Sequence, residues 1–319
     1  MYGARSLFAL GRMTDRPACA ESALRMADLM VNGQRDDGGY WVGYGQPGEC
    51  IYVADGGSIA LGLVQMAGWA DAQHRAAYVE SARRYLQFRE GFRMTDEVVR
   101  ELSERYGADH PGIMPGGIGI GYARTDYFAN VRFPKPFREM RGRAWTLNCS
   151  LGFLAGLYRL TGEAECRNLA IQDARWFLER CRAGEDSSKN PYANEAAIWI
   201  YDLMDDADLR GAMEAELRQA FLPHVSDGKV SSWWTRNDGR GALLLPGLVY
   251  CAREMDNSPK VRAALATALW AVCAETSPES IRQATAPLSV ARPAATTMYA
   301  CFSSTGLAEL LWPRSTLLP

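Results

Sequence analysis

Residues 144–182 read AWTLNCSLGFLAGLYRLTGEAECRNLAIQDARWFLERCR and contain two helical segments of different kinds, with a very short turn between them. Residues 144–160 are apolar or small on nearly every side, which is typical of a helix buried all round. Residues 163–182 carry one apolar stripe against a charged face. The stripe consists of Cys166, Leu169, Ala170, Phe177, Leu178 and Cys181. The pair predicts an inner helix followed by an outer helix that packs on it.

This alternation recurs along the chain. Further segments of the buried kind are residues 54–69, 191–204, 239–255 and 294–312, with residues 2–13 as one more candidate. Further segments of the amphipathic kind are residues 19–33, 71–89, 206–222 and 257–275. Helical hairpins of this kind pack side by side as a double ring. The sequence therefore predicts an all-α fold with about six inner and five outer helices, so a sixth outer helix is missing from the pattern.

The connections between these segments fall into two classes. Those that follow an inner segment are short, at 70–71, 161–163, 205–208 and 256–259. Those that follow an outer segment are long, at 34–53, 90–142, 183–190, 223–238 and 276–293. In a double ring the long connections gather at one end, above the N-termini of the inner helices, where unpaired N–H groups favour anionic groups. We call this end the long-connection end and the opposite one the short-connection end.

The layout resembles the (α/α)6 toroid, the six-hairpin barrel of many glycoside hydrolases and polysaccharide lyases. Residues 142–178, GRAWTLNCSLGFLAGLYRLTGEAECRNLAIQDARWFL, resemble the inner-helix, LYxLTG, outer-helix segments of those enzymes. Residues 34–41, QRDDGGYW, resemble their loops, and also the glycine-rich repeats of terpene cyclases and protein prenyltransferases. The resemblance covers most of the chain as architecture, and no single family is matched. It implies a substrate cleft at the long-connection end.

Length and composition limit the classes of protein to which the chain can belong. The chain has 319 residues, 48% of them apolar, and a formal net charge of −2, so we expect one domain over 1–319 and no nucleic-acid partner. No run approaches the ~18 apolar residues of a membrane span, and the N-terminus lacks the apolar core of a signal peptide. Eight cysteines without a C-x-x-C pair predict reduced, buried thiols in a cytoplasmic protein. Those on apolar helical positions are Cys149, Cys166, Cys251 and Cys273.

Three acidic residues are candidates for catalysis. Asp55, Glu195 and Asp238 each stand at or just before the start of a predicted inner helix, so three helices would bring them to one rim. Glycoside hydrolysis needs one carboxyl as acid and one as base or nucleophile, about 5–10 Å apart. Neighbouring carboxylates also push each other's pKa values apart, which suits those two roles. Each residue equally fits a structural role at a helix N-terminus.

Aromatic and cationic side chains at the same end predict a binding surface for sugars. Residues 34–50, QRDDGGYWVGYGQPGEC, combine five glycines with aromatic rings, including Tyr40, and are expected to form one wall of the cleft. Asp36 and Asp37 in this loop favour a turn. The predicted substrate-binding residues are Trp41, Tyr44, Arg141, Arg143, Asn194, Trp233, Trp234, Arg236 and Tyr299. Because arginine binds carboxylates through paired hydrogen bonds, the cluster points to an acidic, uronate-containing glycan.

Residues 90–142 form the longest connection and are expected to be an inserted lid or cleft loop, with a short polar helix at about 95–106. The motif GGIGIG, residues 116–121, does not follow a strand in a βαβ unit, so it does not predict a dinucleotide site. The acidic run DLMDDAD, residues 202–208, is expected to be a solvated helix junction. The sequence predicts no cofactor, and no compact ligand motif predicts a metal site.

The residues favour hydrolysis of glycosidic bonds in an acidic oligo- or polysaccharide. One alternative is a polysaccharide lyase, in which Arg or Asn neutralises the uronate carboxylate and Tyr removes the C5 proton. A noncatalytic glycan-binding toroid is another, because fold alone does not establish catalysis. The last alternative is a terpene-cyclase-like ring, although the chain lacks the D-x-D-D type of proton donor.

Overall fold

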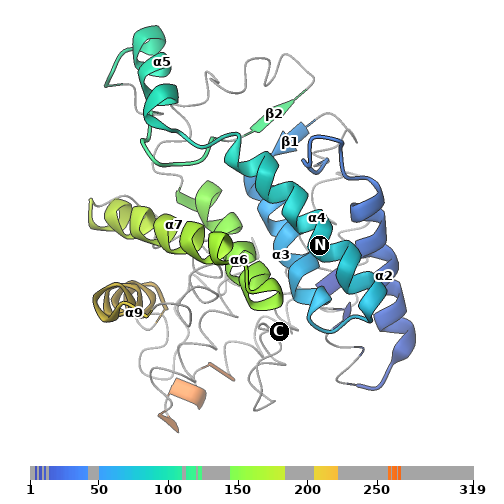
Figure 1. Cartoon of the computed structure of the whole chain (residues 1–319). Helices are drawn as coiled ribbons and strands as arrows, with labels where there is room; N and C mark the ends of the chain where they lie inside the picture. The colour runs from blue at the N-terminus through green and yellow to red at the C-terminus, as the bar shows by residue number, and fades with distance from the viewer. Residues whose placement is uncertain are drawn as a thin grey trace, which may run out of the picture. The chain divides into compact units, whose positions relative to one another are not determined.

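The computed structural model describes residues 14–41, 50–109, 113–119, 121–123, 144–183 and 205–221, with isolated positions within 4–11 and 258–266 (Figure 1). The elements are α2 (Pro17–Asn32), β1 (Cys50–Tyr52), α3 (Val53–Ala67), α4 (Ala72–Glu90), α5 (Asp96–Tyr106), β2 (Gly121–Ala123), α6 (Ala144–Thr161), α7 (Ala164–Arg182) and α9 (Ala207–Phe221). The chain divides into two compact units, residues 28–205 and residues 1–27 with 206–319.

The predicted helices that fall on described residues are confirmed within about two residues. Segments 54–69 and 71–89 correspond to α3 and α4, and segments 144–160 and 163–182 correspond to α6 and α7. The polar helix expected at 95–106 is α5. The remaining predicted helices lie wholly or largely outside the described residues, namely 2–13, 191–204, 239–255, 257–275 and 294–312.

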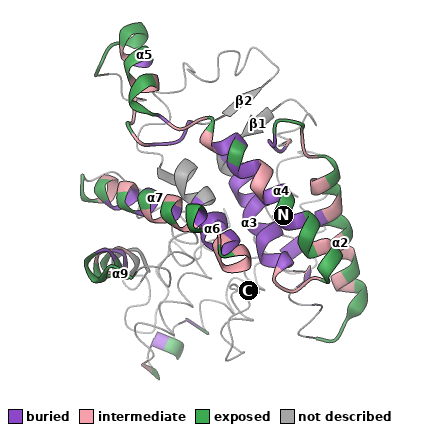
Figure 2. Cartoon of the chain, viewed as in Figure 1, coloured by how far each residue is buried: buried purple, intermediate pink, exposed green. Residues whose placement is uncertain are grey.

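The two kinds of helix differ in burial as the sequence predicts. In α3 every residue from 56 to 67 is buried, and in α6 every residue from 151 to 157 is buried. In α7 the buried residues follow one stripe, which includes Cys166, Ala170 and Phe177, whereas the opposite face is exposed. Figure 2 shows the same contrast between α3 and α7. A helix that is apolar all round can exist in water only with neighbours on every side, so α3 and α6 are inner helices.

The two hairpins of residues 28–205 pack through their inner helices. The inner helix α3 contacts α6, and each inner helix contacts its own outer partner, α4 or α7. Tyr85 of α4 lies edge-on to Phe153 of α6, with ring centroids 5.2 Å apart. A Cβ on Gly56 of α3 would lie 2.6 Å from the Tyr85 ring, so the glycine lets the outer helix approach closely.

The short-connection end of these hairpins is closed by tight, capped turns. Asp71 caps α4 by accepting hydrogen bonds from the backbone N–H groups of Gln73 and His74 at 2.9 and 3.0 Å. Gly162 joins α6 to α7 with a φ of 74°, which favours glycine. Because α3 and α6 both end in these short turns, the long connections that precede them lie at the opposite end of the hairpins.

The long-connection end contains a feature that the sequence did not predict. β1 pairs with β2 as an antiparallel ribbon, with Cys50 opposite Ala123 and Tyr52 opposite Gly121. This ribbon joins the connection before α3 to the long insertion before α6 (Figure 1). Each strand has only three residues, so the protein remains all-α in class.

In the unit formed by residues 1–27 and 206–319, α9 buries Leu209 and Met213 and exposes its charged face. None of the described helices is both long enough and apolar enough to cross a membrane.

Candidate functional site at the long-connection end

The turn at residues 34–41 is built as a rigid element. Asp37 accepts a hydrogen bond from the Gly39 N–H at 3.0 Å and forms an ion pair with Arg35 at 2.8 Å. Gly38 has a φ of 89°, and a Cβ there would lie 2.1 Å from the carbonyl oxygen of Arg84. The turn role predicted for Asp37 is therefore confirmed, and the turn is pressed against α4.

Tyr40 is a core residue and not part of an open cleft wall. Its side chain is 2% exposed and its ring stacks on Tyr85 at 5.4 Å. Its hydroxyl is hydrogen-bonded to the Ser81 hydroxyl at 2.7 Å, and Ser81 also bonds to Gln34. Burial raises the pKa of Tyr40, although Ser81 and Arg84 oppose this effect. The phenol is therefore neutral and unsuited to act as a base.

Trp41 is the predicted substrate-binding residue whose side chain the structure describes. It is half-buried, and the guanidinium carbon of Arg35 lies 4.7 Å from the centroid of its ring. This is a cation–π contact. Because Asp37 holds Arg35, the turn fixes an aromatic ring and a cation side by side at the long-connection end.

Asp55 lies in the first turn of α3, as its third residue, and is therefore inside the helix and not its N-cap. The start of α3 is fixed by Tyr85, whose hydroxyl donates to the Val53 carbonyl oxygen. The other predicted site residues lie outside the described residues. They are Tyr44, Arg141, Arg143, Asn194, Glu195, Trp233, Trp234, Arg236, Asp238 and Tyr299. Convergence of three carboxylates on one rim stays a prediction.

The structure reveals a buried charge cluster that the sequence analysis missed. It consists of Arg89 and Glu90 at the end of α4, Arg93 just beyond it, and Asp173 in α7. Arg89 and Asp173 form an ion pair in which both side chains are fully buried. Arg93 donates to Asp173 at 3.0 Å and to Glu90 at 3.0 Å. Two arginines and two carboxylates thus neutralise one another between the outer helices.

A sequence signal for this cluster exists in retrospect. Asp173 follows Cys166 and Ala170 at helical spacing, so it occupies an apolar position of the α7 stripe. Arg89 follows Tyr85 in the same way along the buried stripe of α4. One acid and one base on two otherwise apolar stripes indicate a buried pair, because an isolated buried charge is too costly.

The electrostatics of the cluster hold Glu90 as a carboxylate. Burial raises the pKa of Glu90, but the hydrogen bond from Arg93 and the charges of Arg89 and Arg93 outweigh burial and lower it. Burial lowers the pKa of Arg93, but Glu90 and Asp173 outweigh that effect, so Arg93 stays charged. A carboxylate with a lowered pKa does not serve as a general acid near neutral pH. The cluster positions neighbouring segments.

One of those segments is residues 113–119, which lie against α7. Arg93 donates to the Gly116 carbonyl oxygen at 3.0 Å, and the Trp176 indole N–H donates to the Pro115 carbonyl oxygen at 2.8 Å. A Cβ on Gly116 or Gly117 would lie 3.2 or 3.1 Å from the Trp176 ring. The adjacent glycines therefore make room for the indole.

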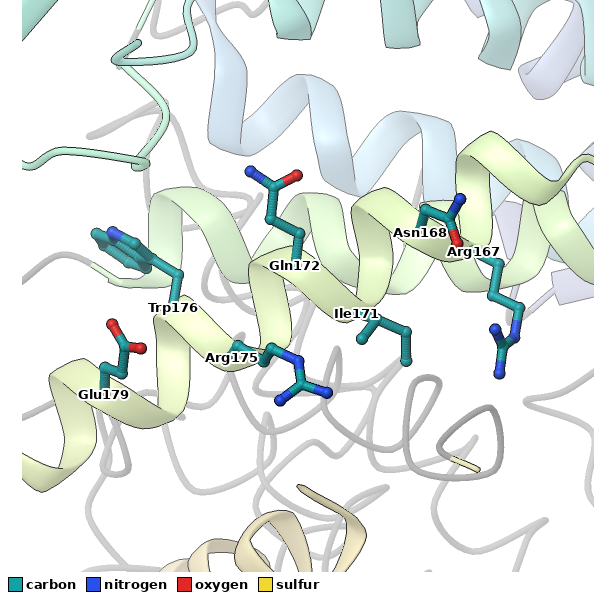
Figure 3. A pocket seen from close by; sticks show the side chains of 7 residues that line it. All are labelled: Arg167, Asn168, Ile171, Gln172, Arg175, Trp176 and Glu179. Carbon is teal, nitrogen blue, oxygen red and sulfur yellow. The ribbon is translucent and has the colours of Figure 1, made fainter. Parts of the chain in front are cut away.

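An open hollow of about 480 Å³ runs along α7 (Figure 3). It is lined by Arg167, Asn168, Ile171, Gln172, Arg175, Trp176 and Glu179. Among the lining groups, Arg167 pairs with Asp205 and Trp176 donates to Pro115. None of the predicted site residues lines it.

Cys166, near the start of α7 at the short-connection end, is not a reactive thiol. Burial, together with Glu163, raises the pKa of Cys166 to about 12, so its thiol is protonated and inert. Within the described residues, no three His, Cys, Asp or Glu side chains gather closely enough to hold a metal ion.

Comparisons with known proteins establish the fold. No protein-family model and no curated protein matches the chain. A solved structure that it resembles is the cellobiose 2-epimerase from Bacillus thermoamylovorans B4167, with a TM-score of 0.54 and 12% sequence identity. The alignment covers 95% of this chain and 85% of that chain. This likeness shows the fold alone, and it confirms the predicted (α/α)6 toroid of helical hairpins.

Proposed function

We propose that this protein is a carbohydrate-active enzyme that binds its sugar at the long-connection end. The observation that carries the proposal is the toroidal fold shared with a cellobiose 2-epimerase over 95% of the chain. The name of that enzyme gives a sugar as its substrate. Because one fold can serve several functions, the proposal also needs residues suited to sugars.

Trp41 and Arg35 supply part of that support. The C–H face of a sugar ring packs well on an indole, and Arg35, which is held by Asp37, keeps a cation against the ring of Trp41. The two groups lie 4.7 Å apart on the turn before α3. The proposed binding surface extends from this turn to Tyr44, Arg141, Arg143, Asn194, Trp233, Trp234, Arg236 and Tyr299.

The proposed reaction is hydrolysis of glycosidic bonds in an acidic glycan. Asp55, Glu195 and Asp238 are the candidates for the acid and for the base or nucleophile. The place of Asp55 in the first turn of α3 suits a carboxylate, because the helix dipole stabilises negative charge there. Asp55 is therefore the better candidate for base or nucleophile, and the general acid would be one of the other two.

Two other reactions are compatible with the same surface. Elimination would use Arg143 or Asn194 to neutralise the uronate and Tyr299 to take the C5 proton. Epimerisation at C2 of a free sugar is favoured by the name of the similar structure. It requires acid–base groups on both faces of the carbon next to the carbonyl. His74 is not suited to supply one, since its ring is hydrogen-bonded to Asp71, the N-cap of α4, at the short-connection end.

The test is incubation with uronate-containing polysaccharides, neutral polysaccharides and cellobiose. Three signals are followed together: new reducing ends, ultraviolet absorbance of an unsaturated uronate, and solvent deuterium incorporated at C2. Reducing ends alone would support hydrolysis, reducing ends with absorbance would support elimination, and deuterium alone would support epimerisation. If none of the three signals rises with folded protein, the enzyme proposal is contradicted. Calorimetry then tests whether the protein binds glycans without turning them over.

A matched pair of variants links any activity to the predicted end. Asp55→Asn removes a candidate carboxylate in α3, whereas Asp71→Asn alters the acid at the start of α4, at the opposite end. We expect at least about a hundredfold loss for the first and nearly full activity for the second. Equal activity in both variants would exclude Asp55 from catalysis.

A further inference from the structure

Residues 93–109 and 113–119, which we call the arm, have an apolar core of their own. Met94 and Leu102 are buried in it, and Val98, Val99, Ile113 and Met114 pack against them. The backbone closes the arm on itself, because the Met94 N–H donates to Gly117 at 2.8 Å and the Gly116 N–H donates to Met94 at 2.9 Å. Thr95 caps α5 by accepting from the Val98 N–H. The arm therefore covers its apolar surface with its own residues.

Among the described residues, the arm is joined to α7 mainly by polar contacts. Arg93 of the arm donates to Asp173 of α7 at 3.0 Å, and the same nitrogen donates to the Gly116 carbonyl oxygen within the arm at 3.0 Å. Trp176, one helical turn after Asp173, donates to Pro115 at 2.8 Å. The contacts that join the arm to α7 are thus one ion pair, one hydrogen bond to a backbone carbonyl, and the packing of Trp176 on two glycines.

We propose that the arm is a hinged lid, held on α7 by a two-point latch made of Arg93 with Asp173 and Trp176 with Pro115. Opening the latch exchanges a few polar contacts for contacts with water and leaves the core of the arm covered. The Arg89–Asp173 pair remains and keeps α4 and α7 together. The lid would thus swing as a folded unit, with its pivots after α4 and before β2.

The position of the arm in the fold indicates what such a motion would do. The arm follows the end of α4 and precedes β2, so both of its roots lie at the long-connection end (Figure 1). Segments that close over a bound ligand there would exclude water and hold the ligand in place. The proposal concerns motion, so it can be tested whichever reaction the protein catalyses.

The test measures two distances by electron–electron spin resonance in the whole protein. Spin labels are attached through noncanonical amino acids, so that the native cysteines stay untouched. One pair reports on the lid, at Glu104 in α5 and Glu165 in α7, and the other reports on the hairpins, at Gln87 in α4 and Glu165. All three positions are exposed.

The latch is opened by Arg93→Gln combined with Trp176→Phe, whereas Trp176→Phe alone releases only the Pro115 point and leaves every charge in place. The matched control is Arg83→Gln with Glu163→Gln, which breaks an ion pair away from the arm. We expect the Glu104–Glu165 distribution to become roughly twofold broader only in the variants that release a latch point, while the Gln87–Glu165 distribution stays narrow in all.

Two results would overturn the proposal. If the Glu104–Glu165 distribution stays as narrow as in the wild type when the latch is open, the arm is fixed by other contacts and is no lid. If both distributions broaden together, Arg93 and Trp176 hold the hairpins themselves and the arm has no motion of its own. If no sugar in the activity panel is turned over, the two distances can still be interpreted, because neither of them depends on substrate.

Discussion

The two ends of the hairpin unit use the same ion-pair chemistry in opposite ways. At the short-connection end, Arg83 of α4 pairs with Glu163, and the side chains are 42% and 37% exposed. At the long-connection end, Arg89 of the same helix pairs with Asp173, and both side chains are 0% exposed. The exposed pair can separate into water at little cost, whereas loss of Asp173 would leave the fully buried Arg89 with Glu90 as its remaining ion-pair partner. The buried pair therefore fixes α4 and α7 against each other more firmly than the exposed pair fixes α4 and the α6–α7 turn.

The largest effect is expected from truncating one partner of the buried pair. Asp173→Ala leaves two buried or largely buried guanidinium groups, of Arg89 and Arg93, with Glu90 as their one shared ion-pair partner in the cluster. We expect it to lower the free energy of unfolding by about 3–5 kcal/mol, measured by urea denaturation. Glu163→Ala at the opposite end should cost less than about 1 kcal/mol. Similar losses in the two variants would remove the contrast between the ends.

A further variant sharpens this comparison. Replacing both buried partners, by Arg89→Met with Asp173→Leu, removes the excess positive charge and leaves Arg93 paired with Glu90. It also removes a guanidinium Nε–H that has no hydrogen-bond partner. The double variant should therefore recover most of the stability that the single variant loses. If the double variant is no more stable than Asp173→Ala, the excess positive charge is not the cause of the lost stability, and the charged groups themselves stabilise the fold.

Two glycines with positive φ allow a matched comparison of backbone strain. Gly38, at the long-connection end, has a φ of 89° and faces the Arg84 carbonyl, whereas Gly162, at the other end, has a φ of 74° and nothing near its missing Cβ. Gly162→Ala should cost about 1 kcal/mol, from conformational strain alone. Gly38→Ala adds a clash with backbone and should cost at least about 2 kcal/mol. Thermal unfolding of both variants tests this order.

A smaller difference is expected between two tyrosine hydroxyls. Tyr40 bonds to buried Ser81, whereas Tyr78 donates to Asp28, whose side chain is 40% exposed. Tyr40→Phe should lower the free energy of unfolding by about 1 kcal/mol. Tyr78→Phe should cost less, because water can replace the hydroxyl at Asp28. The reverse order in denaturant titrations would contradict the burial described for the turn at 34–41.

The smallest effect is a change in acid sensitivity. The folded-state pKa of Glu90 is lowered, so its contribution to stability is complete above the ordinary pKa of a glutamate and is lost as pH falls through the lowered value. Glu90→Gln should therefore flatten the loss of stability in that acidic window. Unfolding free energies measured across the window would contradict this assignment if the slopes of wild type and variant coincide.

The helices could be predicted from the sequence because their periodicity is local. Residues 144–160 were predicted as a helix, and α6 is Ala144–Thr161. The contrast between all-round and one-sided apolar patterns also identified inner and outer helices, which defines the double ring. These signals need no knowledge of contacts distant in sequence.

The parts of the fold and of the candidate site that the sequence does not predict depend on contacts between residues distant in sequence. The β1–β2 ribbon joins residues about seventy positions apart through three residues each, too few for an alternating pattern to show. Tyr40 looked like a cleft aromatic because it stands in a glycine-rich loop, yet Ser81 and Tyr85 of α4 draw it into the core. Of the predicted site, the turn at Asp37 is confirmed, while Asp55 and Trp41 remain candidates for catalysis and binding.

The central claim, that sugars are bound at the long-connection end, is tested most directly by hydrogen exchange followed by mass spectrometry. The protein is compared with and without a saturating uronate oligosaccharide, and separately with cellobiose. We expect one of these sugars to slow exchange in residues 34–41 and 50–56, while residues 68–75 and 161–165 at the short-connection end stay unchanged. Protection confined to the short-connection end, or none with either sugar, would contradict the claim.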